Sequence, residues 1–408
     1  MKKIILICLL VLSACASTMQ SHLNDVQNNF ANGNFESVIQ DDDVQNANNL
    51  DLLIDATALF HENKFHESDA AFEEFNKRNI DETSTSLSRE TAGLVFGAGA
   101  NSYKPYMMDS LFVSYYQIWD LLALHDWANA RVVINQSYER QKNMSIEYKK
   151  LIEQNKNELS NTPDVQNAID KNISEWAAFS DIMNPALMYL SGIYFLNDGD
   201  FATAETYLKR ANGMTPNNTF IKSDLELAQK HIKPNDTAWI FYESGFAPRL
   251  REQNIPIFLP NVGIVSFNFS EPYFNPAPPQ PHGTQMLADV DKMFLTEYNE
   301  YKINEMIRAY TSAVSKAIFQ STMYNSKSDA APILGLLSTI YTVSSSDPDV
   351  RTWATLPKYI YVQRLKKSKS NLNTLNLDDN INLNTRGNDL IYVRLHDKIT
   401  DTKIIELK

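Results

Sequence analysis

The sequence predicts an α+β protein of two domains, in which an all-α array of helical hairpins precedes an α+β domain with a mostly antiparallel sheet. Three observations lead to this prediction: a recurring turn-plus-aromatic pattern before residue 235, a change from Asp236 onward to short β-rich runs, and a separate leader. The 408 residues are enough for two hydrophobic cores. We therefore expect a leader at 1–14, a helical domain at 15–235 and an α+β domain at 236–408.

The leader, MKKIILICLLVLSACAS, carries two lysines, then an apolar run from Ile4 to Leu12, then small residues, which is the layout of a secretory signal peptide. The apolar run is too short to span a membrane, which takes roughly 20 residues. Leu12-Ser13-Ala14-Cys15 resembles the lipobox of bacterial lipoproteins. The resemblance implies cleavage before Cys15, acylation of that cysteine and a stable membrane anchor.

The residues around the lipobox also predict a location. Ala16 stands where an inner-membrane retention signal usually has aspartate, so we expect an outer-membrane lipoprotein that faces the periplasm. The alternative is a plain secreted protein in which Cys15 is incidental. Cys8, the only other cysteine, lies in the segment that would be removed, so the mature chain would have no disulfide and no thiolate metal site.

The charge of the chain argues against two classes of partner. The formal net charge is −12 and no basic face is evident, so attraction to nucleic acid or to an anionic membrane surface has little support. The one local basic run, RLKKSKS at 364–370, is interpreted as a solvated loop. We expect no nucleic-acid partner, and membrane contact only through the lipid anchor.

The stretch LNDGDFATAETYLKRANGMTP, residues 196–216, predicts a helical hairpin. Gly192 and Ala204 would let its two helices approach closely, Gly199-Asp200 would form the turn, and Pro216 would end the second helix. The spacing resembles the tetratricopeptide (TPR) repeat, whose period is 34 residues. The residues at matching offsets are Gly192, Phe195, Gly199, Phe201, Ala204, Leu208, Ala211 and Pro216.

Further copies of this turn predict a stacked array, because one hairpin cannot bury its apolar face alone. The aromatic residue after the turn recurs as Phe35 in NGNFESV, Phe65 in ENKFHES and Trp127 in LHDWANA. The first copy is weak, since Asp42 stands where the others have an apolar residue. The segment PYMMDSLFVSYYQIWDLLAL, which leads into the third turn, predicts a well-buried amphipathic helix.

The C-terminal domain is expected to begin with strands at TAWIFYESGF, IPIFLP and GIVSFNF, followed by the proline-rich connection EPYFNPAPPQPHG. A long helical region is then predicted from Met286 to about Tyr324, and APILGLLSTIYTV is interpreted as a short apolar helix or strand. Three further strands are predicted at KYIYVQRL, DLIYVRLH and TKIIEL. Helices would pack on one face of the resulting sheet.

YESGFAPR (242–249), LADVDKMF (287–294) and DVRTWATLPKYI (349–360) together resemble a family of uncharacterised bacterial TPR-containing lipoproteins. The resemblance covers most of the chain. It implies the fold and the outer-membrane location, and it brings no catalytic residues because such proteins are described by their architecture. The chain departs from the family in having His125-Asp126 where a Gly-Asp turn is usual, which leaves the geometry of that turn open.

Two groups of side chains are candidates for partner binding. Aromatic residues on the concave face of the array could contact an extended peptide or a glycan; they are Tyr103, Tyr106, Tyr115, Tyr116 and Tyr189. In the C-terminal domain, arginine forks and an exposed tryptophan suit carboxylates, phosphates or sugars. These candidates are Arg249, Arg351, Trp353 and Arg364. The alternative is that the aromatic residues are core and the arginines form structural salt bridges.

The sequence contains no recognisable catalytic motif. Its seven histidines form no HExxH and it has no G-x-S-x-G elbow, so we expect no enzymatic activity, no metal site and no cofactor. By analogy of architecture, the predicted function is a periplasmic scaffold that binds envelope proteins, for example in peptidoglycan synthesis or surface-complex assembly. The alternatives are a module that binds peptidoglycan or polysaccharide, and a glycan hydrolase that uses Glu243 and Asp349.

Overall fold

The computed structural model describes residues 14–39, 47–83, 103, 105–160, 184–259, 263–299, 349–368, 386–396 and 398–407. The described helices are α2 (Ala14–Asn32), α3 (Asn49–His61), α4 (Phe65–Thr83), α6 (Met107–Ala123), α7 (Trp127–Ser160), α9 (Pro185–Asp198), α10 (Phe201–Met214) and α11 (Thr219–Gln229). The described strands are β1 (Thr237–Ser244), β2 (Arg249–Leu259), β3 (Gly263–Tyr273), β4 (Gln285–Asp289), β5 (Tyr359–Lys366), β6 (Asn388–Leu395) and β7 (Ile399–Leu407). Nearly all of the predicted leader and the segment 331–343 lie outside the described residues.

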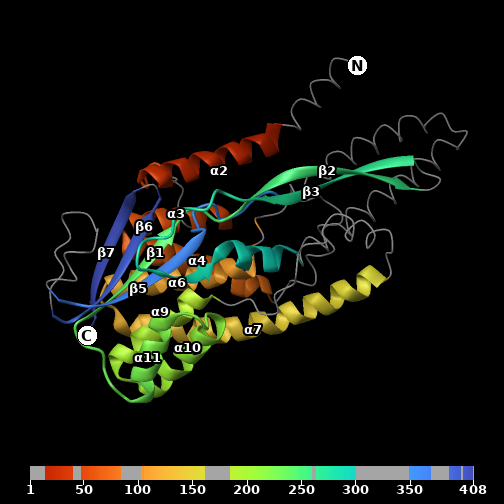
Figure 1. Cartoon of the computed structure of the whole chain (residues 1–408). Helices are drawn as coiled ribbons and strands as arrows, with labels where there is room; N and C mark the ends of the chain where they lie inside the picture. The colour runs from red at the N-terminus through yellow and green to blue at the C-terminus, as the bar shows by residue number, and fades with distance from the viewer. Residues whose placement is uncertain are drawn as a thin grey trace, which may run out of the picture.

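The helices form a layer in which neighbours in the chain are neighbours in space. α3 packs on α4, α4 on α6, α6 on α7 and α9, α9 on α10, and α10 on α11. Figure 1 shows α6, α9 and α10 stacked beside the strands, with the long α7 running outward from them. No helix among the described residues is both long enough and apolar enough to cross a membrane.

Four turns of the helical layer share one geometry. Gly33, Asn63, His125 and Gly199 have positive φ angles of 76°, 59°, 57° and 87°, and each lies two residues before an aromatic residue of the predicted pattern. The N–H of the next residue donates to the carbonyl five positions back, as from Asp126 to Leu121 at 2.8 Å. The recurrence of the turn is therefore confirmed, and His125 takes the conformation usually left to glycine. After Phe35, however, residues 36–38 form a turn rather than a second helix.

The hairpin of α9 and α10 has the close contact that its sequence predicts. A Cβ atom added to Gly192 would lie 2.7 Å from Cδ2 of Leu208, which leaves no room for a larger residue. Asp200 caps α10 by accepting a hydrogen bond from the Thr203 N–H at 3.3 Å. α10 ends at Met214, two residues before Pro216.

The five-stranded sheet has the order β4-β5-β1-β6-β7. β1 pairs parallel with β6, while the other pairs are antiparallel, which confirms the predicted mostly antiparallel sheet. β2 and β3 form a separate antiparallel ribbon, with Arg249 opposite Tyr273 at its base. This ribbon runs away from the larger sheet in Figure 1.

One prediction for this domain is wrong at its start. Residues from Met286 were expected to be helical, but Gln285–Asp289 form β4, which pairs with β5 and has a bulge between Met286 and Ala288. The helix begins at residue 290 and is described to residue 299. The five residues of β4 are compatible with either a helix or a strand. Their pairing with the backbone of β5 stabilises the strand.

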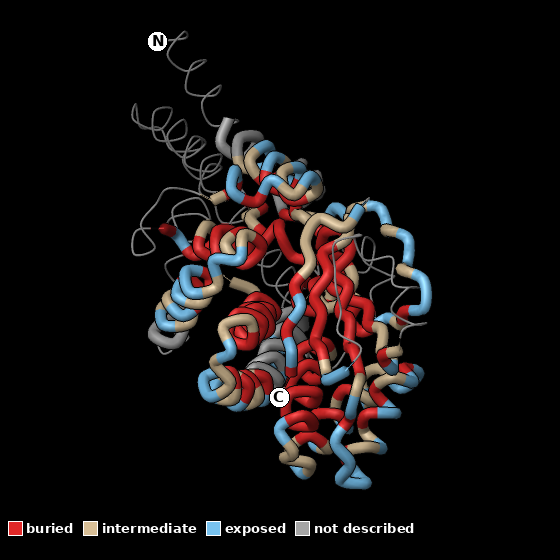
Figure 2. Tube along the Cα trace, turned by 90° about the vertical axis from the view of Figure 1, so that its left-hand side faces the viewer, coloured by how far each residue is buried: buried red, intermediate tan, exposed pale blue. Residues whose placement is uncertain are grey.

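The helices and one face of the sheet share a hydrophobic core. Trp119 of α6 contacts Phe241 of β1 and Tyr392 of β6, with ring centroids 5.5 and 5.4 Å apart. The buried stretches in Figure 2 accordingly concentrate in the strands and in the helices beside them. The boundary at Asp236 thus marks a change of secondary structure and not a gap between two cores.

Candidate binding site

The candidate tyrosines of the helical layer mostly belong to the core. Those with at most 1% of their surface exposed are Tyr103, Tyr115, Tyr116 and Tyr189. Tyr106 is partly buried, and its ring lies 5.2 Å from that of Phe294. The alternative interpretation, that these aromatic side chains pack the core, is therefore confirmed for the four buried residues.

Glu243 lies in the core between α6 and the sheet. Its Oε2 accepts hydrogen bonds from Arg394 Nη1 at 3.0 Å and from the hydroxyls of Tyr116 and Tyr392, both at 2.7 Å. Burial raises the pKa of Glu243, while the Arg394 guanidinium acts in the opposite direction. Asp349 forms its own ion pair with Arg351 at 2.6 Å. The two carboxylates of the predicted hydrolase are thus held in separate ion pairs.

Two more C-terminal candidates make hydrogen bonds inside the protein. Arg364 Nε donates to Asp224 Oδ1 at 2.6 Å, and the other oxygen of Asp224 accepts from Trp239 and Tyr189. Trp353 is 2% exposed, and its Nε1 donates to Thr57 at 2.9 Å. With Arg351 bound to Asp349, the salt-bridge and core interpretation is confirmed for three of the four candidates.

Arg249 is the exception. Its side chain is half-buried, and its Nε and Nη1 atoms are shielded from solvent without a hydrogen-bond partner. Arg249 is therefore the predicted binding residue that the fold leaves available.

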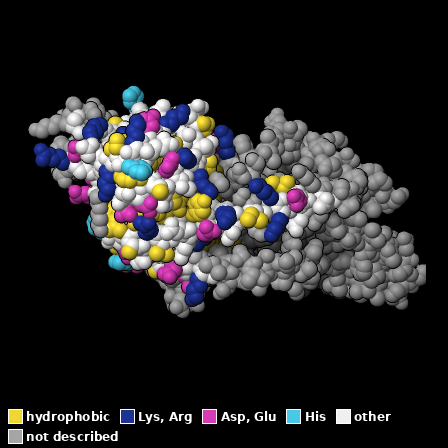
Figure 3. Space-filling view, turned by 90° about the horizontal axis from the view of Figure 1, so that it is seen from below, with side chains coloured by type: hydrophobic (Ala, Val, Ile, Leu, Met, Phe, Trp, Pro, Cys, Tyr) yellow, Lys and Arg dark blue, Asp and Glu magenta, His cyan; other side chains and the backbone are white. Residues whose placement is uncertain are grey.

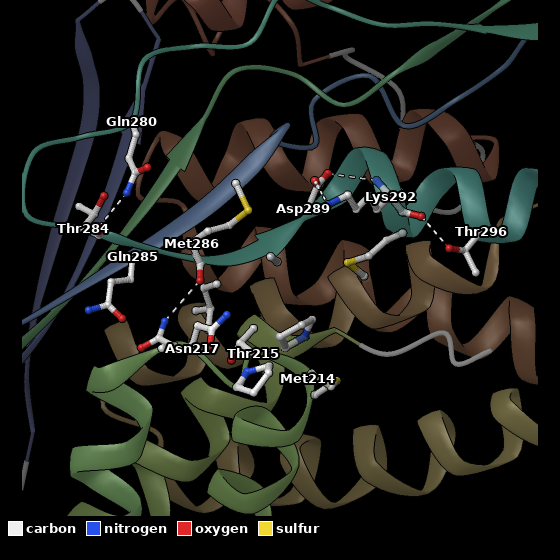
Figure 4. A pocket seen from close by; sticks show the side chains of 16 residues that line it. Met214, Thr215, Asn217, Gln280, Thr284, Gln285, Met286, Asp289, Lys292 and Thr296 are labelled. Carbon is white, nitrogen blue, oxygen red and sulfur yellow. Dashed lines mark hydrogen bonds and ion pairs between the residues drawn. The ribbon is translucent and has the colours of Figure 1, made fainter. Parts of the chain in front are cut away.

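An open pocket lies elsewhere, where the corner between α10 and α11 meets β4 and the helical segment 290–299. Its volume is about 780 Å³, a size typical of small-ligand sites. Figure 4 shows the side chains that these elements contribute to its lining. The residues that line it are Pro185, Met214, Thr215, Pro216, Asn217, Asn218, Gln280, Thr284, Gln285, Met286, Leu287, Ala288, Asp289, Lys292, Met293 and Thr296.

Methionines from three elements supply much of the apolar lining. Met214 comes from the end of α10, Met286 from β4 and Met293 from the segment 290–299. Met286 is 42% exposed. Methionine side chains are flexible and polarisable, and they adapt to apolar partners of different shapes.

Side-chain hydrogen bonds hold the two walls of the pocket together. Asn218 caps α11 through its Oδ1, and its Nδ2 donates to the carbonyl oxygen of Met286 at 3.3 Å. The Thr219 N–H donates to Gln285 Oε1 at 2.7 Å, and Gln285 Nε2 donates to Thr219 Oγ1 at 2.6 Å. These contacts occupy part of the outer edge of β4, which limits the addition of another strand.

The lining carries little free charge. Asp289 and Lys292 form an ion pair at 3.3 Å, and they are the charged residues among those that line the pocket. The face seen in Figure 3 likewise has acidic and basic side chains side by side, with hydrophobic side chains gathered between them. A neutral, methionine-lined pocket favours an apolar or weakly polar ligand surface.

This pocket is hard to predict from the sequence. Pro216 predicts the end of α10, but Met214 lies far from Met286 and Met293 in the chain, and neither helical nor strand periodicity relates it to them. Among the described residues, no group of three or more His, Cys, Asp or Glu side chains is placed to hold a metal ion.

No known family, curated protein or solved structure matches this chain. The pocket, the buried ion pairs and Arg249 are therefore interpreted from their own chemistry.

Proposed function

We propose that this chain is an outer-membrane lipoprotein, anchored through acyl chains on Cys15, that binds envelope proteins in the periplasm as a non-catalytic, TPR-type scaffold. The open methionine-lined pocket carries the binding part of this proposal. The lipobox Leu12-Ser13-Ala14-Cys15 carries the location.

The position of α2 is consistent with a short tether. The helix begins at Ala14, and Leu23 is the first buried residue where the burial of α2 is described, from residue 19 onward; it is 1% exposed. Leu23 lies eight positions after Cys15, a helical rise of about 12 Å. An anchor on Cys15 would thus hold the folded body close to the membrane surface, where partners embedded in or bound to the membrane are within reach.

The stacked hairpins support the scaffold by positioning the pocket. α9 and α10 pack on each other around Gly192, and the corner after Met214 presents its side chains to β4. Since the aromatic residues of the array face the core, the partner surface is assigned to this corner rather than to a tyrosine-lined concave face.

A photo-crosslinking amino acid at Met286 tests the pocket in living cells. Ile404 is a matched control, because both residues are 42% exposed and lie on β4 and β7, the two opposite edges of the five-stranded sheet. We expect discrete envelope proteins to be captured from position 286 and not from position 404. Equal capture from both positions would assign the contacts to proximity and remove the pocket from the proposal.

The anchor is tested separately by Cys15→Ser. We expect loss of labelling by radioactive palmitate and release of the protein from the outer-membrane fraction. Labelling that persists in the variant would place the lipid elsewhere, and membrane association without any label would contradict the lipoprotein assignment.

A further inference from the structure

Arg249 differs from the other arginines that are at least partly buried within the described residues. Each of the others donates a hydrogen bond from its guanidinium group, to Glu, Asp, Ser, Tyr or a backbone carbonyl. Arg249 donates none, and two of its nitrogens are shielded from solvent. Burial lowers the pKa of Arg249, and Tyr273 acts in the opposite direction.

A half-buried cation without an acceptor is costly, because the protein has removed part of its hydration without replacing it. Arginine also stays charged at any physiological pH, so it cannot escape this cost by losing a proton. The neighbouring Arg251 shows the usual solution, since it pairs with Glu271 at 3.1 Å. Arg249 thus has unused capacity to bind an anion.

An exposed aromatic ring lies next to this guanidinium. Tyr273 lies directly opposite Arg249 in the β2–β3 register, and the guanidinium carbon is 5.7 Å from the centre of its ring. Tyr273 is 44% exposed. Its ring therefore offers a flat apolar surface beside the cation.

The acidic residue Glu271, two positions before Tyr273 on β3, is already paired, since it binds Arg251 at 3.1 Å. The charge of Arg249 is therefore not neutralised by Glu271.

We propose that Arg249 and Tyr273 form a site at the base of the β2–β3 ribbon for the carboxylate or phosphate group of an organic ligand whose ring or apolar body packs on the tyrosine ring. Nη2 of Arg249, which is not among the shielded nitrogens, donates to the oxyanion, and the Tyr273 ring supplies the contact for the rest of the ligand. This site shares no residue with the methionine-lined pocket, so it stands independently of the scaffold proposal.

Saturation-transfer NMR and calorimetric titration on the purified full-length protein test the site with simple probes. Phenyl phosphate and benzoate carry both an anion and a ring, inorganic phosphate carries only the anion, and phenol only the ring. We expect at least one of the two combined probes to bind, and to bind more tightly than inorganic phosphate and phenol. Arg249→Gln should weaken that probe at least about tenfold, the loss of one charge-assisted hydrogen-bonding group.

Two further variants separate anion binding from a structural role. Arg251→Gln removes an arginine at the same distance from the Tyr273 ring, and we expect a change in affinity below about threefold, since its charge is already paired. Arg249→Lys keeps the positive charge but loses the planar guanidinium with its several N–H donors, and it should give an intermediate affinity. Without ligand, Arg249→Gln should be at least as thermally stable as the wild type, because no internal hydrogen bond is lost and a charge without an acceptor is removed. If it is less stable, Arg249→Lys supplies the affinity comparison.

The source of the anion is distinguished by flotation with vesicles of phosphatidylcholine alone or with phosphatidic acid, whose headgroup is a phosphate monoester. Flotation that requires both phosphatidic acid and Arg249 identifies a lipid headgroup, whereas probe binding without such flotation identifies a soluble ligand. If neither combined probe binds saturably, or if binding in both experiments is unchanged by Arg249→Gln, the site is overturned.

Discussion

The inner interface between helices and sheet differs sharply from the outer junction between the α10–α11 corner and β4. At the inner interface, charged groups are buried and paired, as Glu243 is with Arg394. At the outer junction, side-chain hydrogen bonds from Asn218 and Gln285 join two walls around open space. Both are contacts between helices and strands, yet one is sealed and the other is open.

The difference assigns separate tasks to the two regions. Removing one member of a buried ion pair leaves the other charge without solvent or partner, so the inner interface should control global stability. Contacts at the surface junction are partly exchangeable with water, so a partner could replace them without unfolding the protein. The predictions below test this separation, from the largest expected effect to the smallest.

Glu243→Gln should be the most damaging substitution. It leaves the Arg394 guanidinium, which is 2% exposed, without a counter-charge, and we expect a loss of about 3–5 kcal/mol in the free energy of unfolding, measured in urea. Asp289→Asn is the matched change at the pocket, where the partner Lys292 is 63% exposed, and should cost about 0–1 kcal/mol. Similar losses for both variants would remove the distinction between the two regions.

The inner interface should also make stability depend on pH through His61. This histidine is fully buried at the end of α3, and burial lowers its pKa from 6.5 to about 4, although its hydrogen bond with Asp401 at 2.7 Å acts in the opposite direction. Lys403 and Arg394 face the same group and further disfavour its protonation. Between about pH 4 and pH 6.5, His61 is therefore mostly protonated in the unfolded chain and mostly neutral in the folded protein.

The sign follows from this difference in proton binding. Below its ordinary pKa of 6.5, His61 is protonated only in the unfolded state, so stability falls as the pH decreases towards about 4, by a total of about 3 kcal/mol. His61→Gln cannot take up this proton. Urea unfolding of both proteins across this pH range should show that the wild type loses more stability than His61→Gln as the pH falls. A constant difference would contradict the assignment.

Packing inside the α9–α10 hairpin is tested by a pair of glycines. Gly192→Ala would push a Cβ atom against Leu208, and we expect a loss of about 1–3 kcal/mol. Gly213, near the pocket end of α10, has nothing within 4 Å of an added Cβ atom, so Gly213→Ala should stabilise the helix by about 0.5–1 kcal/mol. Thermal unfolding of both variants measures the two effects, and equal shifts would show that the close approach at Gly192 does not limit packing.

Local chemistry made the turns and most strands predictable from sequence. A residue in the left-handed conformation followed two positions later by an aromatic residue recurs at four turns, and β1, β5, β6 and β7 follow β-rich runs bounded by turn residues. β4 was not predictable, because five residues of mixed character become a strand only when β5 is available to pair with them.

The sites were harder to predict because their partners are distant in the chain. Glu243 and Arg394 are 151 positions apart, and no local pattern relates them. The same arginine chemistry that suggested a ligand site at Arg351 and Arg364 instead satisfies Asp349 and Asp224 inside the protein. Only the fold distinguishes an arginine with an internal partner from one such as Arg249 that lacks it.

A small effect on stability is expected from Asn218, and this substitution reports directly on the junction. Asn218→Ala removes both the cap of α11 and the hydrogen bond to Met286, whereas Asn48→Ala removes a comparable cap from α3. Each should cost about 1 kcal/mol. Only Asn218→Ala should increase amide hydrogen exchange in β4, because only Asn218 bridges to that strand. If exchange in β4 is unchanged, the hydrogen bond does not hold the wall, and the pocket keeps its shape through the packing of its methionines.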